Sequence, residues 1–109
     1  MARGEGSGCP NCLARKVWRF QILVSEHAFD KLVALDVTYA ELRNALSGYS
    51  EVIEEITVAD GVKEVVLLVD WRNPLHVVVV IDRWRREERV VTLYEPDGDL
   101  WSRDFRRRR

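Results

Sequence analysis

The run Leu75-His76-Val77-Val78-Val79-Val80-Ile81-Asp82 is the most apolar stretch of the chain and constrains its fold most strongly. It is too short to span a bilayer, and the Pro74 directly before it marks a turn. An unbroken series of β-branched residues is typical of a strand that is buried on both faces. The sequence therefore predicts a central strand here, with other elements packed around it.

The length and the charge of the chain allow one domain and set its basic end apart. Its 109 residues suffice for one hydrophobic core. The formal net charge is −1, but Arg103 and Arg106–Arg109 supply five of the 17 basic residues. A basic tail of this kind either contacts nucleic acid or forms a disordered, solubilising end. No secretory signal and no membrane-spanning stretch is recognisable, so we expect a cytoplasmic protein that does not enter a membrane.

Hydrophobic periodicity predicts the element order β-α-α-β-β-β-β. Ser25 is a good helix N-cap, and Thr38 with Glu41 has the spacing of a capping box. Gly48 suits the left-handed position after the second helix, and Asp60-Gly61 predicts a hairpin turn in which glycine accepts a positive φ. The predicted helices lie at 26–35 and 38–48, the predicted strands at 17–24, 52–58, 62–71, 75–82 and 90–94, and a charged loop at 83–89. This order indicates an α+β fold with a mostly antiparallel twisted sheet and two helices on one face.

Residues 1–16 mix Gly, Ser, Arg and Lys without apolar periodicity, which predicts a flexible extension before a single domain at 17–105 and a basic tail at 106–109. Cys9 and Cys12 have the spacing at which two thiolates hold one edge of a zinc ion. A closed site needs four ligands, so His27, His76 or the same cysteines of a second subunit would have to complete it. A disulfide and a reduced, mobile segment are the alternatives. Zinc is the only cofactor that the sequence suggests, and a dimer stays open.

His76 and Tyr94 are the residues with the most promising chemistry. Strand alternation places His76 on one face of the central strand, and an antiparallel pairing around residues 83–89 brings Tyr94 beside it. An imidazole and a phenol, with Arg72 nearby, can move protons and stabilise charge at a phosphodiester, as RNA cleavage by its own 2′-hydroxyl requires. The alternatives are a His76 that donates to a backbone carbonyl and a Tyr94 that is an ordinary strand aromatic.

Arg83, Arg85 and Arg86 surround Trp84 in the predicted loop. Such a group can bind a phosphate backbone while the indole stacks on a base. The neighbouring Glu87 and Glu88 favour the alternative, which is a solvated hairpin tip. Signatures of P-loop, dinucleotide-binding, metalloprotease and nucleophile-elbow sites are absent from the sequence.

Four separate motifs of the chain stand out in their order and spacing: Ser25-Glu26-His27-Ala28, Pro74-Leu75-His76-Val77-Val78-Val79, Thr92-Leu93-Tyr94-Glu95-Pro96-Asp97, and Leu100-Trp101 followed by arginines. Together they resemble domain-of-unknown-function family 4258 of bacteria and archaea over roughly residues 20–109. That family is in turn similar to toxins of type II toxin-antitoxin pairs of the RelE, BrnT and MqsR kind, which are small α+β ribonucleases acting on messenger RNA.

The resemblance implies a RelE-like fold, a metal-independent endoribonuclease, and RNA and an antitoxin protein as partners. It adds His27 to the acid/base candidates His76 and Tyr94, and Lys31 to Arg72 as a phosphate ligand. The family usually has arginines on the first helix where this chain has Lys31 and Leu35, so one expected cation is missing. The alternative is a non-catalytic module that binds protein or nucleic acid through an open sheet edge and its basic tail.

Overall fold

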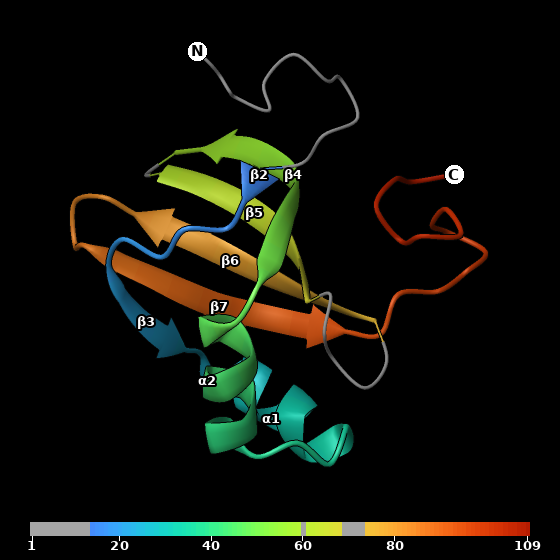
Figure 1. Cartoon of the computed structure of the whole chain (residues 1–109). Helices are drawn as coiled ribbons and strands as arrows, with labels where there is room; N and C mark the ends of the chain where they lie inside the picture. The colour runs from blue at the N-terminus through green and yellow to red at the C-terminus, as the bar shows by residue number, and fades with distance from the viewer. Residues whose placement is uncertain (1–13, 60, 69–73) are drawn as a thin grey trace.

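The computed structural model describes residues 14–59, 61–68 and 74–109, and it has the predicted α+β architecture with two helices and a mixed sheet (Figure 1). The sheet order is β2-β4-β5-β6-β7-β3, in which β3 runs parallel to β7 and every other neighbouring pair is antiparallel. The elements are β2 (Ala14–Arg15), β3 (Gln21–Val24), α1 (Glu26–Ala34), α2 (Tyr39–Ser47), β4 (Ser50–Val58), β5 (Gly61–Leu68), β6 (Leu75–Asp82) and β7 (Glu87–Tyr94).

Both predicted helix starts are confirmed. The Ser25 hydroxyl accepts the amide proton of Ala28 at 3.1 Å, and Thr38 forms a reciprocal capping box with Glu41. These contacts satisfy backbone donors that the first helical turn leaves unpaired. The prediction for Gly48 was wrong, because its φ is −84° and the chain continues in extended form into β4.

Strand β6 divides the core as its alternation predicts. Leu75, Val77 and Val79 point toward the helices, and His76 and Val78 point to the opposite face. The helix-side core joins both helices to the central strands and includes Ala28, Leu32, Leu42, Leu46, Val66, Leu68, Val90 and Leu93. The helices therefore cover one face of the sheet, at the lower end of the molecule in Figure 1.

The hairpin between β4 and β5 forms as predicted, but its glycine has another role. Val58 pairs with Gly61, and among the described glycines none has a positive φ. A Cβ atom on Gly61 would lie only 1.9 Å from the carbonyl oxygen of Ile81 on β6. Glycine is needed here because the neighbouring strand approaches the backbone closely.

Residues 87–89 belong to β7, although their charge predicted a loop. The reason is Glu88, which is buried on the helix side of the sheet and whose charge is compensated there. One oxygen of its carboxylate pairs with the ammonium of Lys16, and the other accepts the amide protons of Arg19 and Phe20. A buried carboxylate can occupy a strand when its charge is paired and its oxygens are hydrogen-bonded.

The segment Lys16–Phe20 crosses the sheet from β2 at one edge to β3 at the other (Figure 1). The side chain of Lys16 lies between this segment and the sheet. Its ammonium is 2.8 Å from Glu64 on β5, pairs with Glu88 on β7 and lies 4.5 Å from the centre of the Trp18 ring. The prediction of a loose extension up to residue 16 was therefore wrong for residues 14–16. Lys16 is buried because both carboxylates face the crossing segment.

No helix in the described part of the chain is long and apolar enough to cross a membrane.

Replacing Glu88 by Ala should lower the free energy of unfolding by about 3–5 kcal/mol, because Lys16 loses a buried counter-ion and two amides lose their acceptor. Urea denaturation followed by circular dichroism measures this change. Glu87→Ala is the matched control on the same strand, since Glu87 is only half-buried and pairs with Arg89 near solvent. We expect it to change stability by about 1 kcal/mol or less. Equal losses in the two variants would contradict a structural role for the buried cluster.

Candidate functional site

His76 and Tyr94 lie side by side, as the sequence predicted. They are direct register partners on β6 and β7, on the sheet face that points away from the helices. The Nδ1 atom of His76 is 3.2 Å from the Tyr94 hydroxyl, and its Nε2 atom is 2.8 Å from the carbonyl oxygen of Phe105. A carbonyl oxygen only accepts, so Nε2 carries the proton and Nδ1 accepts from Tyr94.

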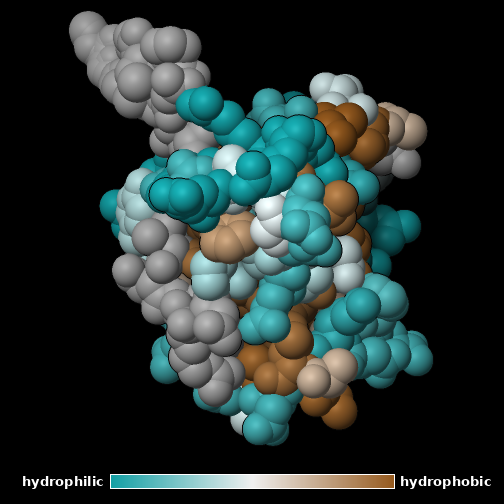
Figure 2. Space-filling model, turned by 90° about the vertical axis from the view of Figure 1, so that its right-hand side faces the viewer, coloured by the Kyte–Doolittle hydropathy of each residue, from teal (hydrophilic) through white to brown (hydrophobic). Residues whose placement is uncertain are grey.

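The C-terminal segment, residues 101–109, covers this pair. Trp101 is buried and stands edge-on to His76 with ring centres 4.4 Å apart. Trp101 forms a β-bridge with Arg108, whose guanidinium lies 4.6 Å from the centre of the indole. In Figure 2, which views the side of the molecule that carries this segment, hydrophilic side chains cover most of the upper part. His76 consequently has no exposed surface.

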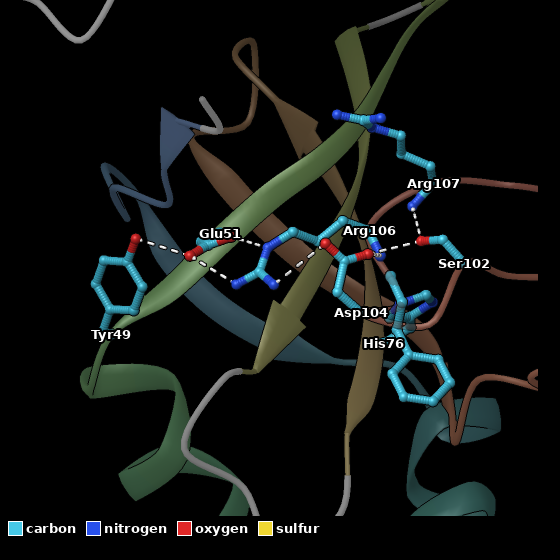
Figure 3. A network of polar contacts seen from close by, with 8 residues as sticks. Tyr49, Glu51, His76, Ser102, Asp104, Arg106 and Arg107 are labelled. Carbon is cyan, nitrogen blue, oxygen red and sulfur yellow. Dashed lines mark hydrogen bonds and ion pairs between the residues drawn. The ribbon is translucent and has the colours of Figure 1, made fainter. Parts of the chain in front are cut away.

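Two arginines hold the C-terminal segment on strand β4. Arg106 binds the carboxylate of Glu51 through two hydrogen bonds of 2.7 and 3.2 Å, and Arg108 binds Glu54 through two of 2.6 and 3.1 Å. Tyr49 donates its hydroxyl proton to Glu51, so that Tyr49 and Arg106 both contact this carboxylate (Figure 3). The hydrogen bonds from Arg106 lower the pKa of Glu51. Of the two alternatives for the basic tail, the disordered end was therefore wrong, because the tail meets acidic partners about 55 residues earlier in the chain.

Burial sets the protonation of the His76–Tyr94 pair. It lowers the pKa of His76, and it raises the pKa of Tyr94, because each charged form would lose its hydration. Both groups are thus neutral at neutral pH, and the free lone pair of Nδ1 is engaged by the Tyr94 hydroxyl. The two side chains are hydrogen-bonded to each other, but in this arrangement the imidazole has no surface on which to meet a substrate.

The remaining candidates for catalysis and phosphate binding do not join this pair. His27 and Lys31 are exposed on α1, which packs on the opposite face of the sheet, because His76 alternates away from the helix-side core. Arg83, Arg85 and Arg86 lie at the other end of β6. Arg72, Cys9 and Cys12 lie outside the described residues. Within residues 14–59, 61–68 and 74–109, no cluster of His, Cys, Asp and Glu could hold a metal ion.

The turn between β6 and β7 forms a second candidate site, which we call the arginine turn (Arg83–Arg86). Trp84 is 93% exposed, and all three arginines of the turn are exposed. The amide of Arg85 donates to Asp82 at 2.9 Å, and Arg86 has a left-handed φ of 56°, so the turn is locally constrained. Among the described residues, the side chains of Arg83 and Arg86 have no hydrogen-bond or ion-pair partner.

A cavity of about 290 Å³ lies between the crossing segment and the sheet, and it reaches the first residue of the arginine turn. Arg83 forms part of its wall, together with Arg19 and Phe20 from the crossing segment and Glu64 and Glu88 from the sheet. Sequence reasoning missed this cavity, since Lys16 fell in the segment predicted to be loose and Glu88 in the predicted loop. The sequence did carry a signal. Glu64 and Glu88 each lie two residues before an apolar residue of a strand, and strict alternation would have placed both on the buried face.

Comparisons with known proteins add no relative to this geometry: no family model matches the chain, and no curated protein or solved structure is significantly similar to it.

The stability of the protein should decrease as pH falls below about 6.5, the ordinary pKa of histidine in an unfolded chain. Burial lowers the pKa of His76 in the folded state, so the unfolded chain binds this proton more readily. The contribution of the neutral imidazole is complete above about pH 6.5 and is lost progressively as pH falls toward the lowered pKa. The loss reaches at most ~1.4 kcal/mol per pH unit. Urea denaturation at about pH 7.5, 6.5 and 5.5 measures it.

Two variants separate His76 from the other histidine. His76→Gln should remove most of the slope between these pH values, because glutamine does not titrate. His27→Gln should keep it, since His27 is exposed on α1. A slope that persists in His76→Gln and disappears in His27→Gln would contradict the assignment.

Proposed function

We propose that this protein binds single-stranded RNA through the arginine turn. The observation that carries the proposal is the 93% exposed indole of Trp84 in a turn where Arg85 pairs with Asp82, but Arg83 and Arg86 have no acidic partner in the described structure. Single-stranded nucleic acids bind where cations follow the phosphate backbone and an aromatic ring offers a stacking surface. Such binding depends weakly on sequence, because every base has a π-face.

The acidic neighbours of the turn leave two of its three cations uncompensated: Asp82 pairs with Arg85 at 3.8 Å, and the two glutamates that follow the turn have other partners. Glu87 is paired with Arg89 at 3.1 Å, and Glu88 is buried against Lys16. Both carboxylates are therefore already paired in the absence of a ligand. They do not neutralise the arginines of the turn, as they would in a solvated hairpin tip. The cations of Arg83 and Arg86 remain free to release counter-ions from RNA when they bind phosphate.

The arginines of the basic tail stabilise the fold, whereas the composition of the tail suggested a nucleic-acid contact or a disordered end. Arg106 and Arg108 are engaged by Glu51 and Glu54, so these cations serve the fold before they serve a ligand. This favours the turn over the tail as the RNA contact.

The resemblance to RelE-like toxins and to family 4258 further suggests that the RNA is messenger RNA and that an antitoxin protein is a partner. Growth arrest on expression, relieved by a neighbouring gene product, is the corresponding cellular test.

RNA cleavage at His76 and Tyr94 is the second candidate function. It is favoured by the 3.2 Å contact between the imidazole nitrogen and the phenol, which is the geometry of a proton-transfer pair. It requires the C-terminal segment to move away, since Phe105 engages Nε2 and Trp101 covers the ring. Catalysis would then depend on release of the arginine contacts that hold this segment.

Replacing Trp84 by Ala should weaken the binding of a fluorescently labelled oligouridylate about 5- to 150-fold, the loss expected for one base-stacking contact. Fluorescence anisotropy titration measures the affinity. Leu100→Ala is the matched control, because Leu100 is also a large exposed apolar residue but lies outside the turn. Equal affinity in wild type and Trp84→Ala would refute the turn as the binding site.

Replacing Arg83 and Arg86 together by Ala should reduce the slope of log K against log salt by about 1.4, whereas Arg43→Ala on α2 should leave it unchanged.

Replacing Glu51 and Glu54 together by Ala should release the C-terminal segment and increase cleavage of a labelled RNA above the wild-type rate. Adding Tyr94→Phe in the same background should abolish this increase, because the phenol is then unable to transfer a proton. Gel analysis of the RNA measures both effects, and circular dichroism establishes that the released variant is folded. Cleavage that is absent in the released variant, or unaffected by Tyr94→Phe, would limit the function to binding.

A further inference from the structure

We propose that the cavity beside the crossing segment holds an unstacked guanine base of the bound RNA. The inference rests on the proposed function, because it identifies the base that the same RNA strand would insert. Arg83 connects the two sites, since it belongs to the arginine turn and also lines the cavity. An RNA strand whose phosphates contact Arg83 can therefore stack one base on Trp84 and place a neighbouring base in the cavity.

The cavity has the size and the walls of a small-ligand site. Its volume of about 290 Å³ lies near the lower end of the range for ligand pockets. Phe20, Val62 and Ile81 supply apolar walls from the crossing segment and from strands β5 and β6. Enzymes and binding proteins that extrude a base hold it between such apolar or aromatic side chains and read its Watson–Crick edge by hydrogen bonds.

Two carboxylates in the cavity wall have few protein donors within the described structure. Glu55 and Glu64 are direct cross-strand partners on β4 and β5, and both line the cavity. Like charges placed directly opposite each other repel. Lys16 lies 2.8 Å from the buried Glu64, but it also neutralises Glu88. The carboxylate of Glu55 is exposed to solvent and has no ion-pair or hydrogen-bond partner among the described residues. A ligand that presents N–H donors would relieve this repulsion.

Guanine is the base whose donors match a carboxylate. Its Watson–Crick edge carries an N1–H and an adjacent amino group, so two donors point the same way toward two acceptor oxygens. Adenine and cytosine each offer an amino donor beside an acceptor nitrogen, and uracil has one donor between two acceptors. An ionised carboxylate only accepts hydrogen bonds, so it pairs in a bidentate manner with guanine alone. The nearby guanidinium groups of Arg15 and Arg19 can bind the phosphate of the same nucleotide.

Short oligouridylates that carry a single guanosine, a single adenosine or neither test the inference. Wild-type protein should bind the guanosine-containing strand about 5- to 30-fold more tightly than the other two, as expected for one well-made bidentate contact of about 1–2 kcal/mol. Glu64→Gln should reduce this preference to less than about twofold, because an amide presents a donor to one of the guanine donors, and should leave the affinity for the uridine-only strand unchanged. Val62→Phe should do the same by filling the cavity without changing the charge. Glu26→Gln on α1 is the control that removes one negative charge elsewhere.

Guanosine monophosphate alone separates this inference from the proposed function. In amide NMR spectra it should shift the Arg19 and Phe20 signals of the wild-type protein, whereas adenosine and uridine monophosphates at the same concentration should not. Strands that bind equally whatever base they carry would overturn the guanine site while the arginine turn still binds RNA. A guanosine monophosphate titration without selective shifts at Arg19 and Phe20 would overturn the guanine site even if no strand bound at all. A selective response to the nucleotide with no binding of any strand would leave the cavity site standing and refute RNA binding by the turn.

Discussion

The rest of the structure depends on the buried ion cluster of Lys16 with Glu64 and Glu88. The crossing segment must pass over the sheet to bring β3 to the far edge, and Trp18 is its residue that packs against the hydrophobic core. Glu88 holds it by taking the Lys16 ammonium and two backbone amide protons. Through this contact a charged strand, β7, becomes an interior member of the sheet, with β3 parallel to it at the edge. A buried ion pair of this kind specifies one path of the chain more than it adds net stability.

The same device operates on the opposite face of the sheet. Arg106 and Arg108 bind carboxylates of β4, and the C-terminal segment they hold seals His76 under Trp101. Both ends of the described chain are thus attached to the sheet by long-range ion pairs. Such pairs near solvent are weaker than buried ones and are screened by salt. The contacts that hold the C-terminal segment over His76 are consequently weaker than the buried cluster around Lys16. Any chemistry at His76 requires these contacts to open.

Local signals in the sequence predicted much of the fold. The capping residues Ser25 and Thr38, the β-branched run of β6 and the pairing of His76 with Tyr94 each follow from contacts or alternation within a few residues or one hairpin. Apart from the backbone conformation of Gly48, the failures involve distant partners. Lys16 and Glu88 are 72 residues apart, and Arg106 is 55 residues from Glu51. In both cases the charged residues were predicted to be solvent-exposed. Their counter-ions are brought close only by the tertiary structure, so no local sequence pattern indicates them.

Charge compensation also decides where a ligand is most easily accommodated. At the His76 end the arginines, the carboxylates and both imidazole nitrogens are engaged with one another, so a ligand would have to displace existing contacts. At the arginine turn the cations of Arg83 and Arg86 have no partner in the described structure, and the cavity nearby places Glu55 opposite Glu64 with a shared deficit of donors. Unpaired cations and two adjacent carboxylates within one neighbourhood suit a ligand that carries both phosphate and N–H donors. A nucleotide has both groups, and this makes the turn and its cavity, more than the histidine pair, the part of the molecule suited to recognition.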